Sequence, residues 1–385
     1  MFSKPVSADE AKIDELLSRG VAEVLPSAAS LKKLLLSGKR LRVKLGIDPT
    51  GAHIHLGNTV PLLKLRDFQN LGHTVVFIIG DATGVVGDTS DKDAERPMLT
   101  EAQVKKNLTS YVAQISKILK KDQLEVRRNS EWLLRLNYRD IGEHADVFSV
   151  ADFIARDNIK RRLDAGKRVS LREVLYPLMQ GYDSVAVKAD IELGGVDQRF
   201  NVLAGRPLQE KYGQAPQHCL LFSLMPGTDG EKMSKSRGNV INVFDAPADM
   251  FGRVMGSRDE VVESFFVSAT RASLPKVSEI MKGHPKDAKM ALAEELVHMY
   301  HGADAAKRAR EDFDKAFSKG EMPSDIPTVE LRGRSLASAL VAAGVVESKS
   351  DYRRLEAAGA ITTLAEDASG KVLKIGKHRF VKITE

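Results

Sequence analysis

The sequence has very little cysteine and no long hydrophobic run. Cys219 is the only cysteine among 385 residues, which excludes an internal disulfide framework and any metal site built from a cluster of cysteines. A chain without disulfides fits a reducing compartment, so we expect a cytoplasmic protein. Uninterrupted apolar runs, such as residues 75–79, are far shorter than the ~20 residues that a membrane helix requires. We therefore expect no insertion into a membrane.

The N-terminus also lacks the hydrophobic region of a secretion signal, so we expect no export. Ser7, with Glu10 three residues later, instead predicts the capped start of a helix. The 58 basic and 52 acidic residues leave a formal net charge of +6, which is compatible with a polyanionic partner but does not prove one. The length allows two or three globular domains, and there is no internal repeat.

The first part of the chain alternates between strand patterns and helix patterns. Helices are predicted over residues 8–19, 28–37, 56–71 and 100–120. Strands are predicted over residues 41–48, 74–79, 184–193 and 219–224. This alternation predicts an α/β fold with an open parallel sheet, whose ligand crevice lies at the carboxyl ends of the strands. The loops rich in glycine follow those ends.

The pattern changes along the chain and divides it into three parts and a linker. Residues 1–225 form the α/β part, with a largely helical insertion at about 129–175. Residues 226–325 are mostly helical, residues 326–334 resemble a linker, and residues 335–385 mix two helices with β segments at 360–364 and 379–383.

Two loops carry the residues expected to bind phosphate. Lys232-Met233-Ser234-Lys235-Ser236 places two ammonium groups between Gly230 and Gly238, where a loop can close on a polyphosphate. Residues 46–58 end at a helix start, whose free N–H groups favour an anion, and there Thr50 and His55 can donate to phosphate oxygens. Gly57 lacks a side chain that would block a flat ring. A solvated basic loop and an ordinary capped helix are the structural alternatives.

Together these loops resemble the signatures of the class I aminoacyl-tRNA synthetases. His55-Leu56-Gly57-Asn58 corresponds to the HIGH signature, and residues 232–236 to the KMSKS signature about 175 residues later. The resemblance implies a Rossmann-like catalytic domain at 1–225, a helical anticodon-binding domain at 226–325 that begins with the KMSKS loop, and a small α+β RNA-binding domain at 335–385.

Two further segments, residues 176–184 and 194–201, resemble the tyrosyl-tRNA synthetases within this class. Tyr176, Gln180 and Asp183 are spaced i, i+4 and i+7, which places them on one face of a helix. A phenol, an amide and a carboxylate on one stripe suit a polar cavity, although a polar surface stripe has the same spacing.

The resemblance implies a role for each matching residue. Asp183 accepts the phenol hydroxyl of L-tyrosine, while Asp88, Tyr176 and Gln180 hold its ammonium; Asn129 and Gln198 complete the amino-acid pocket. Gly195 and Asp197 face the ribose of ATP, and Gly46 and Asp48 form the stretch of protein backbone near it. Gly57 and Asn58 lie on the adenine side. The phosphates are surrounded by Thr50, His55, Lys92, Arg96, Lys232 and Lys235.

The implied reaction needs no general base, because the ionised carboxylate of tyrosine attacks the α-phosphorus itself. ATP is a substrate that arrives with Mg²⁺, and the sequence shows no protein cage for the metal. A second step transfers the tyrosyl group to tRNA(Tyr), so the resemblance also implies an RNA-binding surface and a homodimer formed through the insertion. The basic cluster at 156–168 and Lys349, Arg353 and Arg354 are candidates for RNA contact.

The sequence departs from the best-known pattern at several positions, and two other functions remain open. Asn58 replaces the second histidine of HIGH, Thr89 and Asp91 replace a common Pro and Gly, and Lys44 stands where many tyrosyl enzymes have a tyrosine that touches the substrate. A tryptophanyl enzyme would lack the stripe of Tyr176, Gln180 and Asp183. A silent RNA-binding paralogue would bind tRNA without tyrosine-dependent pyrophosphate exchange.

Overall fold

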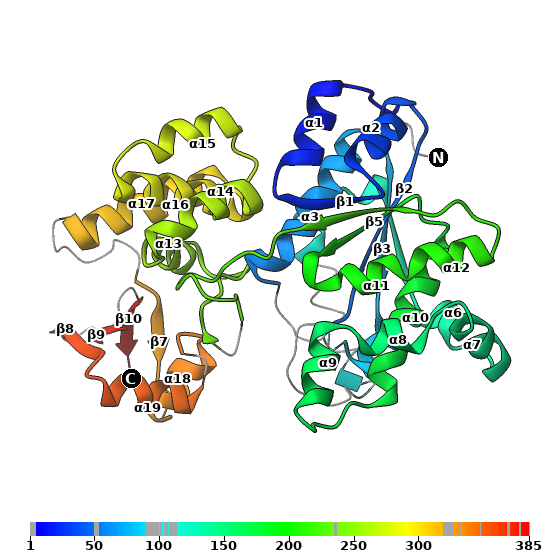
Figure 1. The fold of residues 1–385 in the computed structure, drawn as a ribbon. Coiled ribbons are helices and arrows are strands. Elements are labelled where there is room, and N and C mark those ends of the chain that lie inside the picture. Colours follow the sequence, from blue (N-terminus) through cyan, green and yellow to red (C-terminus); the bar gives the residue numbers. More distant parts are fainter. Residues whose placement is uncertain are drawn as a thin grey trace. The chain divides into compact units, whose positions relative to one another are not determined.

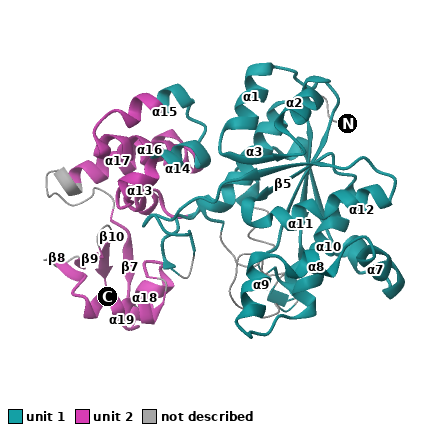
Figure 2. Ribbon diagram, in the orientation of Figure 1, with its two compact units in different colours: residues 1–244, 263–277 teal, residues 245–262, 278–385 magenta. Residues whose placement is uncertain are grey.

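The computed structural model describes residues 5–49, 54–88, 100, 102–103, 107, 114–234, 237–318, 326–331, 333–346, 348–367, 370–376 and 379–384. The chain forms two compact units, residues 1–244 with 263–277 and residues 245–262 with 278–385 (Figure 2). These units differ from the predicted division after residue 225. The loop at 226–244 belongs to the first unit, where the backbone N–H of Leu56 donates to Ile241 and that of Val243 to Ile54.

A six-stranded sheet forms the centre of the first unit (Figure 1). Its strands are β1 (Val21–Leu25), β2 (Arg42–Ile47), β3 (Thr74–Ile79), β4 (Leu124–Arg128), β5 (Ile191–Gly195) and β6 (His218–Phe222). The spatial order is β1-β6-β5-β2-β3-β4, in which β2 to β6 run parallel and β1 pairs antiparallel with β6. The predicted α/β fold with a parallel-rich sheet is confirmed.

The sequence patterns do not predict the two edge strands, β1 and β4. The central strand β3 is buried along its whole length and is a continuous apolar run, as expected for a parallel strand covered on both faces. In contrast, β4 carries Glu125, Arg127 and Arg128 and contains no fully buried residue. An edge strand of this kind has no apolar period from which it can be recognised.

Helices flank the sheet and connect its strands. In the first unit they are α1 (Glu10–Ser18), α2 (Ala28–Leu36), α3 (Leu56–Asn70), α4 (Asp81–Val86), α6 (Ser130–Leu133), α7 (Tyr138–Ala145), α8 (Val150–Ile154), α9 (Asp157–Asp164), α10 (Leu171–Val187), α11 (Arg199–Leu203) and α12 (Gly205–Lys211). The chain leaves β2 in one direction through α3 to β3, and later returns through α10 to β5 on the other side of β2. Right-handed crossovers in opposite directions place α3 and α10 on opposite faces of the sheet (Figure 1). The switch point between β2 and β5 is where such folds bind ligands.

The predicted strand at 184–193 is partly wrong. Helix α10 continues to Val187 and is ended by Lys188 in the left-handed conformation with φ 51°, and β5 begins only at Ile191. A short apolar run does not distinguish a buried helix end from a buried strand, because each is apolar on all sides and shows no period. Tyr176, Gln180 and Asp183 therefore all lie on one continuous helix.

Other local predictions differ in smaller ways. Helix α1 begins at Glu10 and is capped by Asp9, whose Oδ1 accepts from the backbone N–H of Lys12, so the cap is not Ser7. The insertion at 129–175 is helical, as predicted, and contains α6 to α9 and the start of α10. The predicted helix at 100–120 lies partly outside the described residues. Its described part is helical at 102–103, 107 and 114–115, but residues 116–120 are not helical, so the helix does not extend to residue 120 as predicted.

The second unit combines a helical part with a small sheet. Its described helices are α13 (Pro247–Met255), α16 (Pro285–His301), α17 (Ala303–Ser318), α18 (Leu336–Ala342) and α19 (Lys349–Ala357). Between α13 and α16 the chain forms α14 (Val262–Ala269), which belongs to the first unit except for its first residue, and α15 (Leu274–Met281), which is divided between the two units. Its strands are β7 (Thr328–Glu330), β8 (Ile361–Asp367), β9 (Gly370–Ile375) and β10 (Arg379–Thr384), in the order β7-β10-β9-β8. Residues 246–318 are helical without a strand, as predicted. Strand β9 is not predicted, and β7 lies inside the stretch 326–334 that was predicted as a linker.

Residues 263–277 belong to the first unit because polar contacts fix them to its N-terminal helices. The buried guanidinium of Arg19 donates from Nε to the carbonyl of Val267 at 2.9 Å and from Nη2 to that of Ala272 at 2.7 Å. Arg271 forms an ion pair with Asp67 of α3 at 2.9 Å. Among the described residues, no helix has both the length and the apolar character needed to cross a membrane.

Candidate active site

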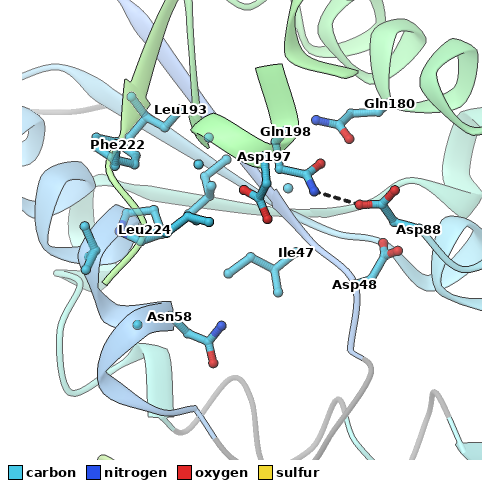
Figure 3. A pocket seen from close by; sticks show the side chains of 18 of the residues that line it. Ile47, Asp48, Asn58, Asp88, Gln180, Leu193, Asp197, Gln198, Phe222 and Leu224 are labelled. Carbon is cyan, nitrogen blue, oxygen red and sulfur yellow. Dashed lines mark hydrogen bonds between the residues drawn. The ribbon is translucent and has the colours of Figure 1, made fainter. Parts of the chain in front are cut away.

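A cavity of about 720 Å³ opens in the first unit at the carboxyl edge of the sheet (Figure 3). The ends of β2, β5 and β6 supply its floor, and α3, α4, α10 and the loop after β6 supply its walls. It therefore lies at the switch point between β2 and β5.

The structure brings together all the described residues that were predicted for tyrosine and ATP. The cavity is lined by Gly46, Asp48, His55, Gly57, Asn58, Asp88, Asn129, Tyr176, Gln180, Asp183, Gly195, Asp197, Gln198 and Lys232. The other predicted phosphate ligands, Thr50, Lys92, Arg96 and Lys235, lie outside the described residues.

Asp183 is the most buried charged residue of the described cavity lining and is 3% exposed. Its Oδ1 accepts from the indole Nε1 of Trp132 at 2.8 Å and its Oδ2 from Nδ2 of Asn129 at 3.4 Å. Burial raises the pKa of this carboxyl to about 7, and the ammonium of Lys44 acts in the opposite direction. Because each carboxylate oxygen has two lone pairs, Asp183 can still accept from a hydroxyl group in the cavity.

Two carboxylates, Asp48 and Asp88, lie close together in the lining of the cavity (Figure 3). The hydroxyl of Tyr176 donates to Oδ2 of Asp48 at 2.8 Å, and Nε2 of Gln198 donates to Oδ2 of Asp88 at 2.7 Å (Figure 3). Burial, followed by the nearby charge of Asp48, raises the pKa of the Tyr176 phenol well above its ordinary value, so it remains a donor. Neighbouring carboxylates attract a cation, and an α-ammonium group has the charge and donors to match them.

Glycine shapes the wall beside Asp48. At Gly80 a Cβ would come within 2.0 Å of Oδ1 of Asp48, which also accepts from the hydroxyl of Thr83 at 2.7 Å. At Gly46 a Cβ would meet no atom within 4 Å. Packing within the protein therefore requires glycine at position 80 but not at position 46, where the missing side chain leaves room in the cavity.

The two signature loops meet at the start of α3. His55 precedes the helix, and Oδ1 of Asn58 accepts from its backbone N–H at 3.3 Å. The backbone N–H of Gly57 lies 3.3 Å from Sδ of Met233, its acceptor. Gly57 lines the cavity, and a Cβ at this position would stand 3.1 Å from the same sulfur. Its assignment to the adenine side of ATP stays a prediction.

Several residues of the site have no signal in the sequence. Trp132 and Thr83 bond to Asp183 and Asp48 from other elements, while Ile47, Leu193, Phe222 and Leu224 form an apolar part of the lining (Figure 3). For Ile47, Leu193 and Phe222, a position at or near the carboxyl end of a strand is a clue in the sequence, because side chains at that edge face the crevice. Lys44 is not part of the lining and is fully buried behind α10.

The residues predicted to contact RNA are placed as follows. Lys349, Arg353 and Arg354 are exposed on α19, where Arg354 pairs with Asp351 at 2.6 Å. In the cluster at 156–168, Arg162 is buried and forms an ion pair with Glu173 at 2.5 Å, so it does not belong to an RNA-binding surface. Its role is structural because the pair joins α9 to α10.

The fold and the site define a class of protein. The family described as "tRNA synthetases class I (W and Y)" matches residues 36–318, which include every described residue that we assign to the cavity. Tyrosine–tRNA ligase of Moorella thermoacetica is 43% identical over 390 residues, covering 96% of this chain and 94% of that protein. Tyrosine–tRNA ligase of Carboxydothermus hydrogenoformans is 41% identical over 397 residues, covering 96% and 97%.

Solved structures agree with the fold. Tyrosyl-tRNA synthetase of Archaeoglobus fulgidus, complexed with L-tyrosine, matches with a TM-score of 0.63 at 22% identity, covering 78% of this chain and 100% of that one. A C-terminally truncated mitochondrial tyrosyl-tRNA synthetase of Aspergillus nidulans matches with a TM-score of 0.67 at 22% identity, covering 80% and 94%. The chain belongs to the class I aminoacyl-tRNA synthetases and, within them, to the tyrosine–tRNA ligase family.

Proposed function

We propose that this chain activates L-tyrosine with ATP and transfers the tyrosyl group to the 3′-terminal adenosine of tRNA(Tyr). The observation that carries the proposal is Asp183, a buried carboxylate in the lining of the cavity, on the same helix face as Tyr176 and Gln180. A carboxylate there accepts a hydrogen bond from a hydroxyl at the para position of the ring. Phenylalanine has no hydroxyl and leaves the carboxylate without this bond.

The part of the cavity around Asp88 and Gln180 would bind the α-ammonium of the substrate. Asp88 and the side-chain oxygen of Gln180 are the acceptors, and Tyr176 and Asp48 hold each other in place by their hydrogen bond. Asn129 and Trp132 orient Asp183, and Gln198 orients Asp88. The substrate carboxylate then points toward the ATP side of the cavity.

ATP, with its Mg²⁺, would occupy the side formed by Gly46, Gly57, Asn58, Gly195 and Asp197. The tyrosine carboxylate attacks the α-phosphorus, an O–P bond forms, and the bond to the β-phosphate oxygen breaks with release of pyrophosphate. Donors around the phosphates stabilise the charge that moves to pyrophosphate. We assign this role to His55 and Lys232, and to Thr50, Lys92, Arg96 and Lys235 outside the described residues. In the second step a ribose hydroxyl of tRNA displaces AMP from the tyrosyl adenylate.

The remaining surfaces have proposed roles in assembly and in binding of tRNA. The insertion exposes large apolar side chains, among them Leu134, Tyr138, Val150 and Leu171, and such residues gather where subunits meet. We propose a homodimer through this insertion. The helical part of the second unit would bind the anticodon arm, and Lys349, Arg353 and Arg354 would contact RNA phosphates. We also propose a cytoplasmic location, where Cys219 remains reduced.

Pyrophosphate exchange with each of the twenty amino acids tests the function. Tyrosine alone should support exchange, and exchange driven by tryptophan would overturn the proposed substrate. The Asp183→Asn variant should weaken the use of tyrosine far more than that of ATP, because its amide carbonyl forms a weaker hydrogen bond than a carboxylate. Equal losses for the two substrates would contradict the role of Asp183.

A further inference from the structure

A buried ion pair bonds to Gln180, one of the residues that line the cavity. Lys44 on β2 and Glu192 on β5 are register partners of adjacent parallel strands, and Nζ of Lys44 stands 3.0 Å from Oε1 of Glu192. Their side chains are 0% and 1% exposed. Neither residue lines the cavity.

The ammonium of Lys44 uses all three of its N–H donors inside the protein. Besides the bond to Glu192, it donates to the backbone carbonyl of Gln180 at 2.9 Å and to Oγ of Ser184 at 2.8 Å. A lysine has three donors and no acceptor, so Lys44 has none left for the phenol of a substrate. It fixes one turn of α10 to the sheet instead.

Glu192 collects donors from the same turn and from the segment before β6. Its Oε1 accepts from Nε2 of Gln180 at 3.1 Å, and its Oε2 accepts from Oγ of Ser184 at 3.0 Å and from Nε2 of Gln217 at 2.6 Å. An ionised carboxylate only accepts hydrogen bonds. The side chain of Gln180 must therefore turn its NH₂ group toward Glu192.

This constraint decides which end of the Gln180 amide serves the ligand. Gln180 lines the cavity (Figure 3), and with its nitrogen held by Glu192 the end left for a ligand is the carbonyl oxygen. A carbonyl oxygen attracts an ammonium group, whereas an NH₂ group in its place would repel it.

We infer that Lys44 and Glu192 are positioning residues, which orient the Gln180 amide so that its oxygen accepts from the α-ammonium of tyrosine. The inference rests on the proposed role of Gln180 as an ammonium ligand. Stability does not explain the pair, because replacing a buried ion pair by apolar side chains of similar size is often neutral or stabilising. What an apolar pair cannot supply is an acceptor for the Gln180 nitrogen.

Two matched double variants separate positioning from structural support. In Lys44→Met with Glu192→Leu, neither position carries a charge and the acceptor for Gln180 is lost. In the control, Lys44→Met with Glu192→Gln, the introduced amide still offers a carbonyl oxygen to Nε2 of Gln180, and Oγ of Ser184 can accept from its NH₂. The amide of Gln217, which donates to Oε2 of Glu192 in the wild type, must turn its own oxygen toward this NH₂ group. Thermal unfolding and the KM for ATP should remain close to wild type in both variants.

The readout is calorimetric binding of two ligands that differ only in the ammonium, tyrosinol and 3-(4-hydroxyphenyl)propan-1-ol. In the Leu variant the Kd for tyrosinol should rise roughly tenfold or more while that for the ligand without the amine stays unchanged. The control should keep most of the wild-type preference for tyrosinol. Unchanged preference in the Leu variant, or parallel loss of both ligands, would overturn the inference.

The wild-type protein tests the underlying assignment separately. If it binds the two ligands equally, the cavity does not recognise an ammonium, and both the proposed ammonium site and the inference are contradicted. If it prefers tyrosinol but the Leu variant keeps that preference, only the positioning role is contradicted.

Discussion

At the scale of single residues, Asp183 links recognition to the stability of the fold. Its pKa is raised by burial from 3.8 to about 7, so the folded chain holds this proton over a pH range in which the unfolded chain has released it. A raised carboxyl pKa contributes stability that is complete below about pH 4 and is lost as the pH rises through about 7. The buried carboxyl that selects a hydroxyl therefore lowers the free energy of unfolding of the ligand-free protein at neutral pH, compared with its value at acid pH.

This decrease is measurable by urea unfolding of the wild type and of Asp183→Asn at about pH 5 and about pH 8. The Asn variant does not ionise, so it should gain about 2 kcal/mol or more relative to the wild type between these two values. A difference that does not change with pH would show that Asp183 keeps an ordinary pKa.

The buried pair gives a second prediction at this scale. Lys44→Met alone leaves Glu192 without its counter-charge at 1% exposure, and should lower the free energy of unfolding by roughly 3–5 kcal/mol. Adding Glu192→Leu should restore most of that loss, because no uncompensated charge is then buried. Urea unfolding of the single and double variants measures both changes. Additive losses in the double variant would contradict the pairing.

At the scale of elements, the carboxyl end of β2 supplies an open position for a ligand. Gly46→Ala adds a methyl group where no protein atom lies within 4 Å, so the fold should tolerate it. If ATP passes close to this strand end, the KM for ATP should rise roughly tenfold, or about 1.4 kcal/mol. Gly142→Ala on α7 is a matched control, because its added Cβ also meets no atom but lies away from the cavity. Equal kinetics for the two variants would contradict the placement of ATP.

The elements also explain what the sequence can and cannot predict. The spacing of Tyr176, Gln180 and Asp183 was sufficient to place them on one face, because a helix repeats every 3.6 residues whatever surrounds it. The boundary between α10 and β5 was not predictable, since Ser184–Val187 is apolar enough for either structure. The contacts of Trp132, Thr83 and Glu192 join segments far apart in the chain, and no local pattern encodes such pairs.

At the scale of the whole molecule, the exposed apolar residues of the insertion predict a dimer. Sedimentation at micromolar concentration should give about twice the chain mass of 42.2 kDa. Val150→Asp, at a position 72% exposed, should weaken the association without changing the thermal stability of the separated chain, because a charge is desolvated only when the surface is covered. A wild-type protein that sediments as a monomer would contradict the proposed interface.

The central claim is that Asp183 selects tyrosine by accepting its hydroxyl, and selectivity measures it most directly. The quantity is the ratio of kcat/KM for tyrosine to that for phenylalanine in pyrophosphate exchange, determined for the wild type and for Asp183→Asn. Tyrosyl-tRNA synthetases are already known to discriminate by about 10⁵-fold without editing. We predict a wild-type ratio of that order and a fall of at least tenfold in the Asn variant. A ratio that the substitution leaves unchanged would contradict the account.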